Sequence, residues 1–256
     1  MGDLHMSTQA RWTYNSEDEP RPHVHPLRTP SGFVLTRNAP EDHPWHHGLW
    51  FTIKFVDCDN FWEELEPFGR LLQSGGEVDW VRPDGSVALR ERRVLAEVDL
   101  GADAWALDWT TELEAPADVL LDRTPFTTWG GYGGLALRGS GEWVDTRLLL
   151  ADGTTGRRIT GTPAAWLDLS GPSGGVSVLD APDNPRAPVP WYASTRSKVY
   201  GEEGWSNFLN AAFLFHEPLT LGAGEVLRFR YRVVVHDGVW EADRAHAAWD
   251  EWTGGR

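Results

Sequence analysis

Five of the nine histidines in the chain fall between residues 23 and 47. Two lie in RPHVHPLRTP and three in EDHPWHHGLW, where Glu41 and Asp42 accompany them. A carboxylate beside an imidazole raises its pKa, while burial lowers that of another ring. Rings held in different protonation states can remove one proton and deliver a second, so the segment predicts an acid–base site. The candidate catalytic residues are His23, His25, Asp42, His43, His46 and His47.

The same histidines could instead bind a divalent metal ion. If the HVH segment is extended, its two rings point to the same side, as a pair of metal ligands would. Imidazoles with a carboxylate would suit zinc, iron or manganese. The spacing matches no helical H-E-x-x-H signature, so a metal-free pocket is the first interpretation, and histidines that only organise loops are a third. The candidate ligands are His23, His25, His43, His46 and His47.

Polar and aromatic side chains elsewhere in the chain are candidates for substrate binding. Arginine can hold a substrate oxygen or carboxylate, and aromatic rings can stack on a sugar or simply fill a core. The 15 tryptophans are more than core filling requires. We expect substrate contacts from Arg28, Trp50, Asn60, Glu63, Tyr132, Arg138, Asn184, Trp191, Asn207 and His216, with Glu64, Tyr192 and Asn210 as polar neighbours of this set.

Composition limits the classes of partner. The formal charge of −15 disfavours nucleic acid and anionic lipid. A single cysteine, Cys58, excludes an internal disulfide and a cysteine-rich zinc site. The sequence shows no apolar run of signal-peptide or membrane-span length. We expect a cytoplasmic protein that binds a small molecule, has no nucleic-acid or membrane partner, and could form a homo-oligomer.

Short apolar or alternating segments, separated by Gly, Pro, Asn and Asp, must position these side chains. Residues 31–37, 49–56, 86–100, 104–115, 141–151, 175–182, 210–221 and 225–238 have the lengths and patterns of strands. Only residues 239–252 are typical of a helix, with Trp240, Ala245 or Ala248, Trp249 and Trp252 on one stripe. The pattern predicts an all-β fold: a single large antiparallel β-sandwich over residues 21–256 with a short C-terminal helix, after a flexible lead-in over residues 1–20.

Several blocks resemble the bacterial PmoA-family domain of unknown function. They are HPLRTPSGFVLTRNAPEDHPWHHGLWF, DNFWEE, GGYGGLALR, AAWLDLSG, GVSVLDAPDNPRAPVPWYA and NAAFLFHEPLTLGAGEVLRFRYRVVVHDG, which occur in the same order over about residues 20–240. The family label implies a methane oxygenase subunit, yet that membrane enzyme needs spanning helices, and no apolar run here is long enough. We therefore do not expect that activity. The resemblance also implies a functional link to a sugar oxidoreductase.

More distantly, DWTTELEAPADVLLDRTPF and the strands after it resemble galactose-mutarotase-like β-supersandwich proteins. This resemblance implies a sugar bound in an open cleft and a His–carboxylate pair that opens the ring. The H-x-Y motif and glutamate of that family align to no single position here, so it supports a sugar substrate more than mutarotation. We expect proton transfer on a sugar or keto-sugar, of mutarotase, epimerase or lyase type. The alternatives are a metal-dependent isomerase, lyase or hydrolase, and a non-catalytic carbohydrate-binding module.

Overall fold

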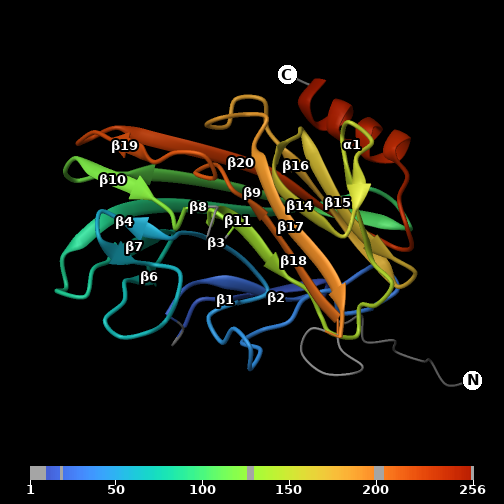
Figure 1. Cartoon of the computed structure of the whole chain (residues 1–256), viewed down its shortest axis with the longest axis horizontal. Helices are drawn as coiled ribbons and strands as arrows, with labels where there is room; N and C mark the ends of the chain where they lie inside the picture. The colour runs from blue at the N-terminus through green and yellow to red at the C-terminus, as the bar shows by residue number, and fades with distance from the viewer. Residues whose placement is uncertain (1–9, 18–19, 126–129, 199–204, 255–256) are drawn as a thin grey trace, which may run out of the picture.

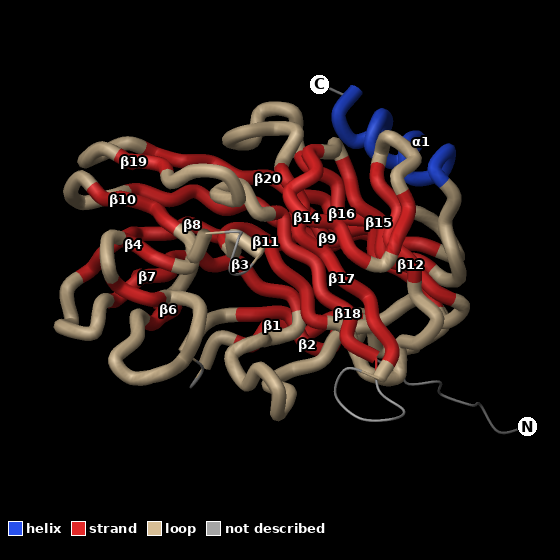
Figure 2. The backbone as a smooth tube through the Cα atoms, in the orientation of Figure 1, coloured by secondary structure: helices blue, strands red, loops and turns tan. Residues whose placement is uncertain are grey.

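The fold is built from antiparallel β-sheets. The computed structural model describes residues 10–17, 20–125, 130–198 and 205–254, and Figure 1 shows their arrangement. Strands dominate the described part, and a single helix, α1 (Ala242–Gly254), lies at its C-terminal end (Figure 2). The expected all-β sandwich with a short C-terminal helix is therefore confirmed.

One large sheet has seven strands. In spatial order they are β1 (Trp12–Asn15), β2 (His23–Leu27), β3 (Leu49–Ile53), β11 (Gly133–Arg138), β18 (Trp205–Ala211), β17 (Pro190–Ser197) and β14 (Arg158–Pro163). Two histidines of the histidine-rich segment lie in β2, and the other three lie in the connection between β2 and β3.

A second large sheet has nine strands. In spatial order they are β13 (Thr155–Gly156), β12 (Arg147–Leu150), β15 (Trp166–Gly171), β16 (Gly174–Asp180), β20 (Val226–His236), β9 (Ala104–Glu114), β8 (Val87–Asp99), β7 (Glu77–Val81) and β6 (Arg70–Ser74). A small sheet follows the order β19 (Leu219–Leu221), β10 (Val119–Asp122), β4 (Phe55–Val56) and β5 (Asp59–Asn60).

The main hydrophobic core fills the interior between the two large sheets. Phe51 of β3 and Phe229 of β20 meet across it, with ring centroids 5.2 Å apart. Strand β20 alternates as its sequence predicts: Phe229, Tyr231 and Val233 are buried, while Arg230 is partly exposed. Because side chains alternate along a strand, every second residue of the seven-stranded sheet points away from this interior. We call that side the outer face.

Helix α1 covers one end of the nine-stranded sheet on the side away from the main core. Ala245 is fully buried, and Trp249 and Trp252 pack on a separate apolar cluster that includes Trp166 of β15. In Figure 1 the helix is the red coil at the upper right. The stripe predicted from the sequence is confirmed. No helix of the described residues is long and apolar enough to cross a membrane.

Three expectations about local structure need correction. Residues 31–37 form no continuous strand and contribute only isolated bridges, such as that of Thr36 with Gly139. Residues 210–221 are split, because turns separate the end of β18 from β19. Within the expected flexible lead-in, Trp12–Asn15 form β1, which pairs with β2; residues 1–9 and 18–19 lie outside the described part.

Candidate functional site

A row of directly opposed residues crosses the outer face of the seven-stranded sheet. His23 pairs with Trp50, Trp50 with Ala136, Ala136 with Asn210, and Asn210 with Tyr192. Residues opposite one another on neighbouring antiparallel strands lie on the same face. The row therefore brings side chains from β2, β3, β11, β18 and β17 together on one surface, and the residues discussed next are placed on or above it.

The loop between β2 and β3 carries most of the histidines over this face. A bridge between Asn38 and His47 closes its base. Gly48 follows with φ +67°, and a Cβ there would lie 2.4 Å from the carbonyl oxygen of Val24. Glycine is required at this point because it alone tolerates both the positive φ and the close backbone approach. We call residues 38–47 the histidine loop.

Asp42 joins the histidine loop to the sheet. Its Oδ2 accepts hydrogen bonds from His43 Nδ1 and from Arg138 Nη2, each at 2.6 Å. The His43 side chain is 30% exposed, whereas those of Asp42 and Arg138 are 10% and 3% exposed. Burial raises the pKa of Asp42, but the bonds from His43 and the charge of Arg138 outweigh it, so the pKa lies below its ordinary value. Asp42 is thus an ionised carboxylate that orients a reachable imidazole.

His46 lies beneath His43, among aromatic rings. Its ring stacks on His43 at 4.7 Å and on Phe208 of β18 at 5.2 Å, and Trp50 lies 5.2 Å away. Burial, and then the charge of Arg138, lower its pKa well below the ordinary value. His46 is therefore a neutral ring that supports His43 from below.

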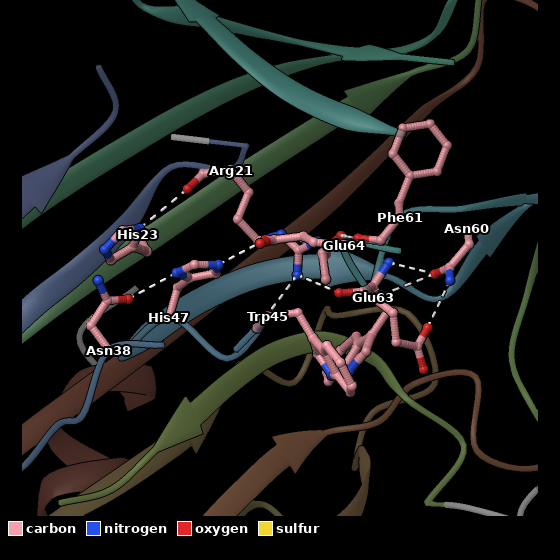
Figure 3. A network of polar contacts seen from close by, with 11 residues as sticks. Arg21, His23, Asn38, Trp45, His47, Asn60, Phe61, Glu63 and Glu64 are labelled. Atoms are coloured by element: carbon pink, nitrogen blue, oxygen red, sulfur yellow. Dashed lines mark hydrogen bonds and ion pairs between the residues drawn. The ribbon is translucent and has the colours of Figure 1, made fainter. Parts of the chain in front are cut away.

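His47 belongs to a buried polar network, shown in Figure 3. Its Nδ1 donates to Asn38 Oδ1 at 2.8 Å, and its Nε2 lies 2.7 Å from Glu64 Oε1. Both ring nitrogens of His47 therefore have polar partners within hydrogen-bond distance. Glu64 also lies 3.5 Å from the guanidinium of Arg21, which donates to the backbone oxygen of Trp62 at 2.8 Å.

His23 lies beside His47 at the edge of this network. The two ring centroids are 4.9 Å apart, and His23 Nδ1 faces the backbone oxygen of Arg21 at 3.2 Å. Burial, followed by the charge of His47, lowers the pKa of His23 to about 4. His23 is therefore a neutral ring near neutral pH.

Half-buried aromatic rings lie on the same outer face as His43, and Trp45 contacts it directly. Trp45 meets His43 edge-on at 5.5 Å, and Tyr132 stacks on the buried Trp62 at 4.7 Å and 11°. Tyr192 of β17 meets Tyr132 edge-on at 5.6 Å. Burial raises the pKa of Tyr132, and the neighbouring Tyr192 raises it further, so its hydroxyl stays protonated. We call Trp45, Tyr132 and Tyr192 the aromatic wall.

The DNFWEE segment fixes Trp62 under this wall. Asn60 Oδ1 accepts from the backbone nitrogen of Trp62 at 2.8 Å and from that of Glu63 at 3.1 Å. Glu63 in turn accepts from Asn60 Nδ2 at 2.8 Å and pairs with Lys54. Asn60 and Glu63 therefore hold the turn that presents Trp62, and their expected contact with substrate stays a prediction.

Comparison with models of protein families assigns the chain to a family. A model described as a family of unknown function, DUF6807, matches residues 3–250. The chain belongs to the DUF6807 family. No curated protein matches it. The family carries no assigned activity, so the chemistry of the DUF6807 site must be argued from its side chains.

Two residues expected to bind substrate point into the interior of the DUF6807 fold instead. Trp191 is fully buried, and its Nε1 donates to the backbone oxygen of Ala164 at 2.8 Å. Asn207 is also fully buried and accepts from Thr146 and Thr195 at 2.7 and 2.8 Å. Side chains alternate between the two faces of a strand, so Trp191 and Asn207 face the interior. Their chain neighbours Tyr192 and Phe208 lie on the outer face, where the site is.

The remaining predicted residues lie apart from His43. Asn184 bonds Asp180 at 2.7 Å beside the nine-stranded sheet. The Arg28 guanidinium donates to the oxygen of Gly32, and exposed His216 lies in the turns after β18. His25 lies beyond His23 along β2, where its Nδ1 bonds Thr36 at 2.9 Å; burial and the charge of Arg28 lower its pKa. The predicted residues brought together at the site are His23, Asp42, His43, His46, His47, Trp50, Asn60, Glu63, Tyr132 and Arg138.

The donor set does not form a metal site in the described residues. No three His, Cys, Asp or Glu side chains there converge closely enough to hold an ion. The geometry explains this, because His43 Nδ1 is bonded to Asp42 and both nitrogens of His47 are bonded to oxygens. His23, His25, His43 and His47 each have a hydrogen-bond partner, and His46 is packed among aromatic rings, so no metal is assigned to these candidate ligands.

Sequence reasoning missed several residues that build the DUF6807 site. Arg21 stands two residues before His23, so strand alternation could have placed the two side chains on one side. Phe208 lies between two singled-out asparagines and could have been found in the same way. Contacts of the histidine loop with Glu64 join distant segments and leave no local signal. The missed residues are Arg21, Asn38, Trp45, Lys54, Trp62 and Phe208.

Proposed function

We propose that this protein is a carbohydrate-active enzyme that transfers a proton on a sugar or keto-sugar, as a mutarotase, epimerase or lyase does. One observation carries the proposal: Asp42 is bonded at 2.6 Å to both His43 and the buried Arg138, while His43 itself is partly exposed. A carboxylate that orients an imidazole and stabilises its cation is the recurring support of a general acid–base residue.

The hydrogen bond to Asp42 fixes how His43 would act. In the tautomer with the proton on Nδ1, the lone pair is on Nε2. Nε2 would accept a proton from an anomeric hydroxyl or from a carbon next to a carbonyl. The resulting imidazolium is paired with ionised Asp42 and would return the proton to the substrate, or to the ring oxygen released on opening. No atom is gained or lost by the protein in this cycle.

The aromatic wall supports a sugar as the substrate. Trp45, Tyr132 and Tyr192 are half-buried; Trp45 contacts His43, and the two tyrosines are connected to it through Phe208 and His46. The C–H faces of a pyranose pack on such rings, while its hydroxyls require the donors and acceptors that imidazole and carboxylate groups provide. The mutarotase-like and PmoA-like resemblances agree with this substrate class, and they remain part of the proposal.

Proton exchange on sugars in deuterium oxide, followed by proton NMR, tests the proposal. A panel of aldoses and ketoses is incubated with protein, and both anomer interconversion and deuterium incorporation next to the carbonyl are measured. We expect catalysis of one reaction, with His43→Gln and Asp42→Asn slowing it by about 100-fold or more. His246→Gln is the matched control, because His246 is an exposed histidine on α1. Binding without exchange would favour a carbohydrate-binding module instead.

A further inference from the structure

Arg158 of β14 lies on the same outer face as the proposed active site. It pairs with Ser194 of β17, Ser194 pairs with Phe208 of β18, and Phe208 pairs with Arg138 of β11. This second cross-strand row runs parallel to the row that contains Tyr192. Three strand steps of about 4.8 Å place Arg158 roughly 14 Å from the Arg138 backbone. One or two sugar rings span a distance of this order.

A continuous series of ring contacts connects Arg158 with His43. The guanidinium carbon of Arg158 lies 5.9 Å from the ring centroid of Tyr192, and Tyr192 lies 5.9 Å from Phe208. Phe208 contacts His46 at 5.2 Å, and His46 stacks on His43 at 4.7 Å. Arg158 is therefore one end of the surface whose other end is the acid–base group.

Charges near His43 are balanced in pairs. Arg138 is paired with Asp42, Arg21 lies against Glu64, and Lys54 is bonded to Glu63. The arginine and lysine side chains there each have a carboxylate partner, so none of them is left without an anion.

The Arg158 end differs. Arg158 is exposed, and no carboxylate of the described residues lies within salt-bridge distance of it. The next outward position of β17 is Arg196, which is also exposed and is likewise without such a partner in the described part of the chain. In a chain of formal charge −15 most anions are repelled, so two nearby exposed arginines with no carboxylate partner among the described residues favour an anion at this end of the face.

We propose that the substrate is an acidic sugar whose carboxylate or phosphate group is bound by Arg158. The inference rests on the proposed sugar site and names its substrate class. A guanidinium presents parallel N–H donors that match both anionic groups. Its position against Tyr192 lets the sugar ring lie on the aromatic wall while the anionic group meets Arg158 and the reacting carbon lies toward His43.

Calorimetric titration at low ionic strength tests the inference through binding alone. The probes are glucuronate, galacturonate, gluconate, glucose 6-phosphate and galactose 1-phosphate, with glucose, galactose and inorganic phosphate for comparison. We expect at least one acidic sugar to bind about 10-fold or more tightly than its neutral parent. Arg158→Gln should remove that preference, while Arg158→Lys should keep part of it. Added salt should weaken the binding of the acidic sugars and leave the binding of the neutral sugars unchanged.

Arg90→Gln is the matched control, since Arg90 is an exposed arginine of β8 on the other large sheet and has no carboxylate within salt-bridge distance among the described residues. Its affinities should equal those of the unmodified chain. The inference is overturned if neutral sugars bind as tightly as acidic ones, if no acidic sugar binds, if Arg158→Gln keeps the preference, or if inorganic phosphate binds as tightly as the sugar phosphates. Acidic-sugar binding without proton exchange would overturn the proposed function alone.

Discussion

Glu64 is shared by two buried basic side chains, and the histidine loop depends on it. It lies 2.7 Å from His47 and 3.5 Å from Arg21, whose side chain has no exposed surface. Removing one member of a buried ion pair leaves an uncompensated charge, which typically costs 3–5 kcal/mol, about the stability of a small domain. Glu64 should therefore stabilise the fold at the same place where it positions the histidine loop.

The variant Glu64→Gln should lower the free energy of unfolding by about 3 kcal/mol or more, because Arg21 and His47 would lose their shared anion. Urea unfolding followed by tryptophan fluorescence measures the change. Glu66→Gln is the control: Glu66 pairs with Arg70 on the surface, where both side chains are largely exposed, so its loss should cost under about 1 kcal/mol. Equal effects of the two substitutions would contradict the buried network.

His23 makes stability depend on pH. Its folded pKa is about 4, below the ordinary value of 6.5, because burial disfavours the imidazolium. The unfolded chain binds the proton first as the pH falls, so this contribution is complete above pH 6.5 and is lost between 6.5 and 4. From pH 7.5 to 5 the loss from this group is about 2 kcal/mol.

Urea unfolding at pH 7.5 and 5 should therefore show a smaller acid-induced loss for His23→Gln than for the unmodified chain, by about 2 kcal/mol. The neighbouring His46, whose pKa is lowered in the same direction, contributes equally to both proteins and cancels in the comparison. An identical loss in the two proteins would mean that His23 is protonated in the folded state at pH 5.

At the scale of the element, the turn into β3 positions the histidine loop through Gly48. Gly48→Ala would combine a positive φ with a Cβ 2.4 Å from the Val24 oxygen. Gly85→Ala is a matched control, because Gly85 also has a positive φ, +89°, but open space around its Cβ position. The control should lose about 1–2 kcal/mol of unfolding free energy from the backbone conformation alone.

Gly48→Ala should lose at least about 1 kcal/mol more than Gly85→Ala in the same urea experiment, because the clash must shift β2 or the loop base. It should also slow proton exchange, since the loop carries Asp42 and His43. A Gly48→Ala protein that matches the control in stability and keeps full activity would show that the loop tolerates this shift.

Strand patterns predicted the fold class and placed Trp50 and Arg138 near the histidines, but they could not separate the two faces of the sheet. In β11 and β18 nearly every residue is buried, because aromatic side chains and the histidine loop cover the outer face as fully as the core covers the inner one. An alternation of apolar and polar residues is therefore hidden. In β17 the burial does alternate, but the sequence alone does not say which alternate residues face outward: Trp191 was chosen, whereas Tyr192 is the residue on the outer face.

Contacts between residues far apart in the sequence could not be predicted from local patterns either. Arg138 and Asp42 are 96 positions apart and meet only because β3 lies next to β11. The loop that carries Asp42 contains Pro40 and Pro44, and the bridge between Asn38 and His47 closes it, so the directions of its side chains depend on this closure. The residue types predicted acid–base chemistry, whereas the choice of His43 as the reachable ring needed the assembled sheet.

At the scale of the molecule, apolar material is arranged in three layers: the interior between the large sheets, the cluster under α1, and the aromatic layer of the outer face. The first two are closed by strands or helix. The third is bordered by partly exposed His43, Trp45, Tyr132 and Tyr192. This layer offers its rings on the same face as His43, so stability and sugar binding should depend on different faces of the same sheet.

Trp191 and Tyr192 test this division, because they are consecutive residues of β17 on opposite faces. Trp191→Ala removes a fully buried ring from the interior and should lower the unfolding free energy by about 3–5 kcal/mol while leaving the sugar affinity of the folded protein unchanged. Tyr192→Ala removes a half-buried ring and should cost less stability but weaken sugar binding about 10-fold, by loss of stacking and of the ring against which Arg158 lies. Urea unfolding gives the unfolding free energy of each variant, and calorimetric titration gives its sugar affinity.

If Trp191→Ala weakens binding more than Tyr192→Ala does, the ligand does not lie on the outer face, because only the outer-face residue, Tyr192, can contact it there.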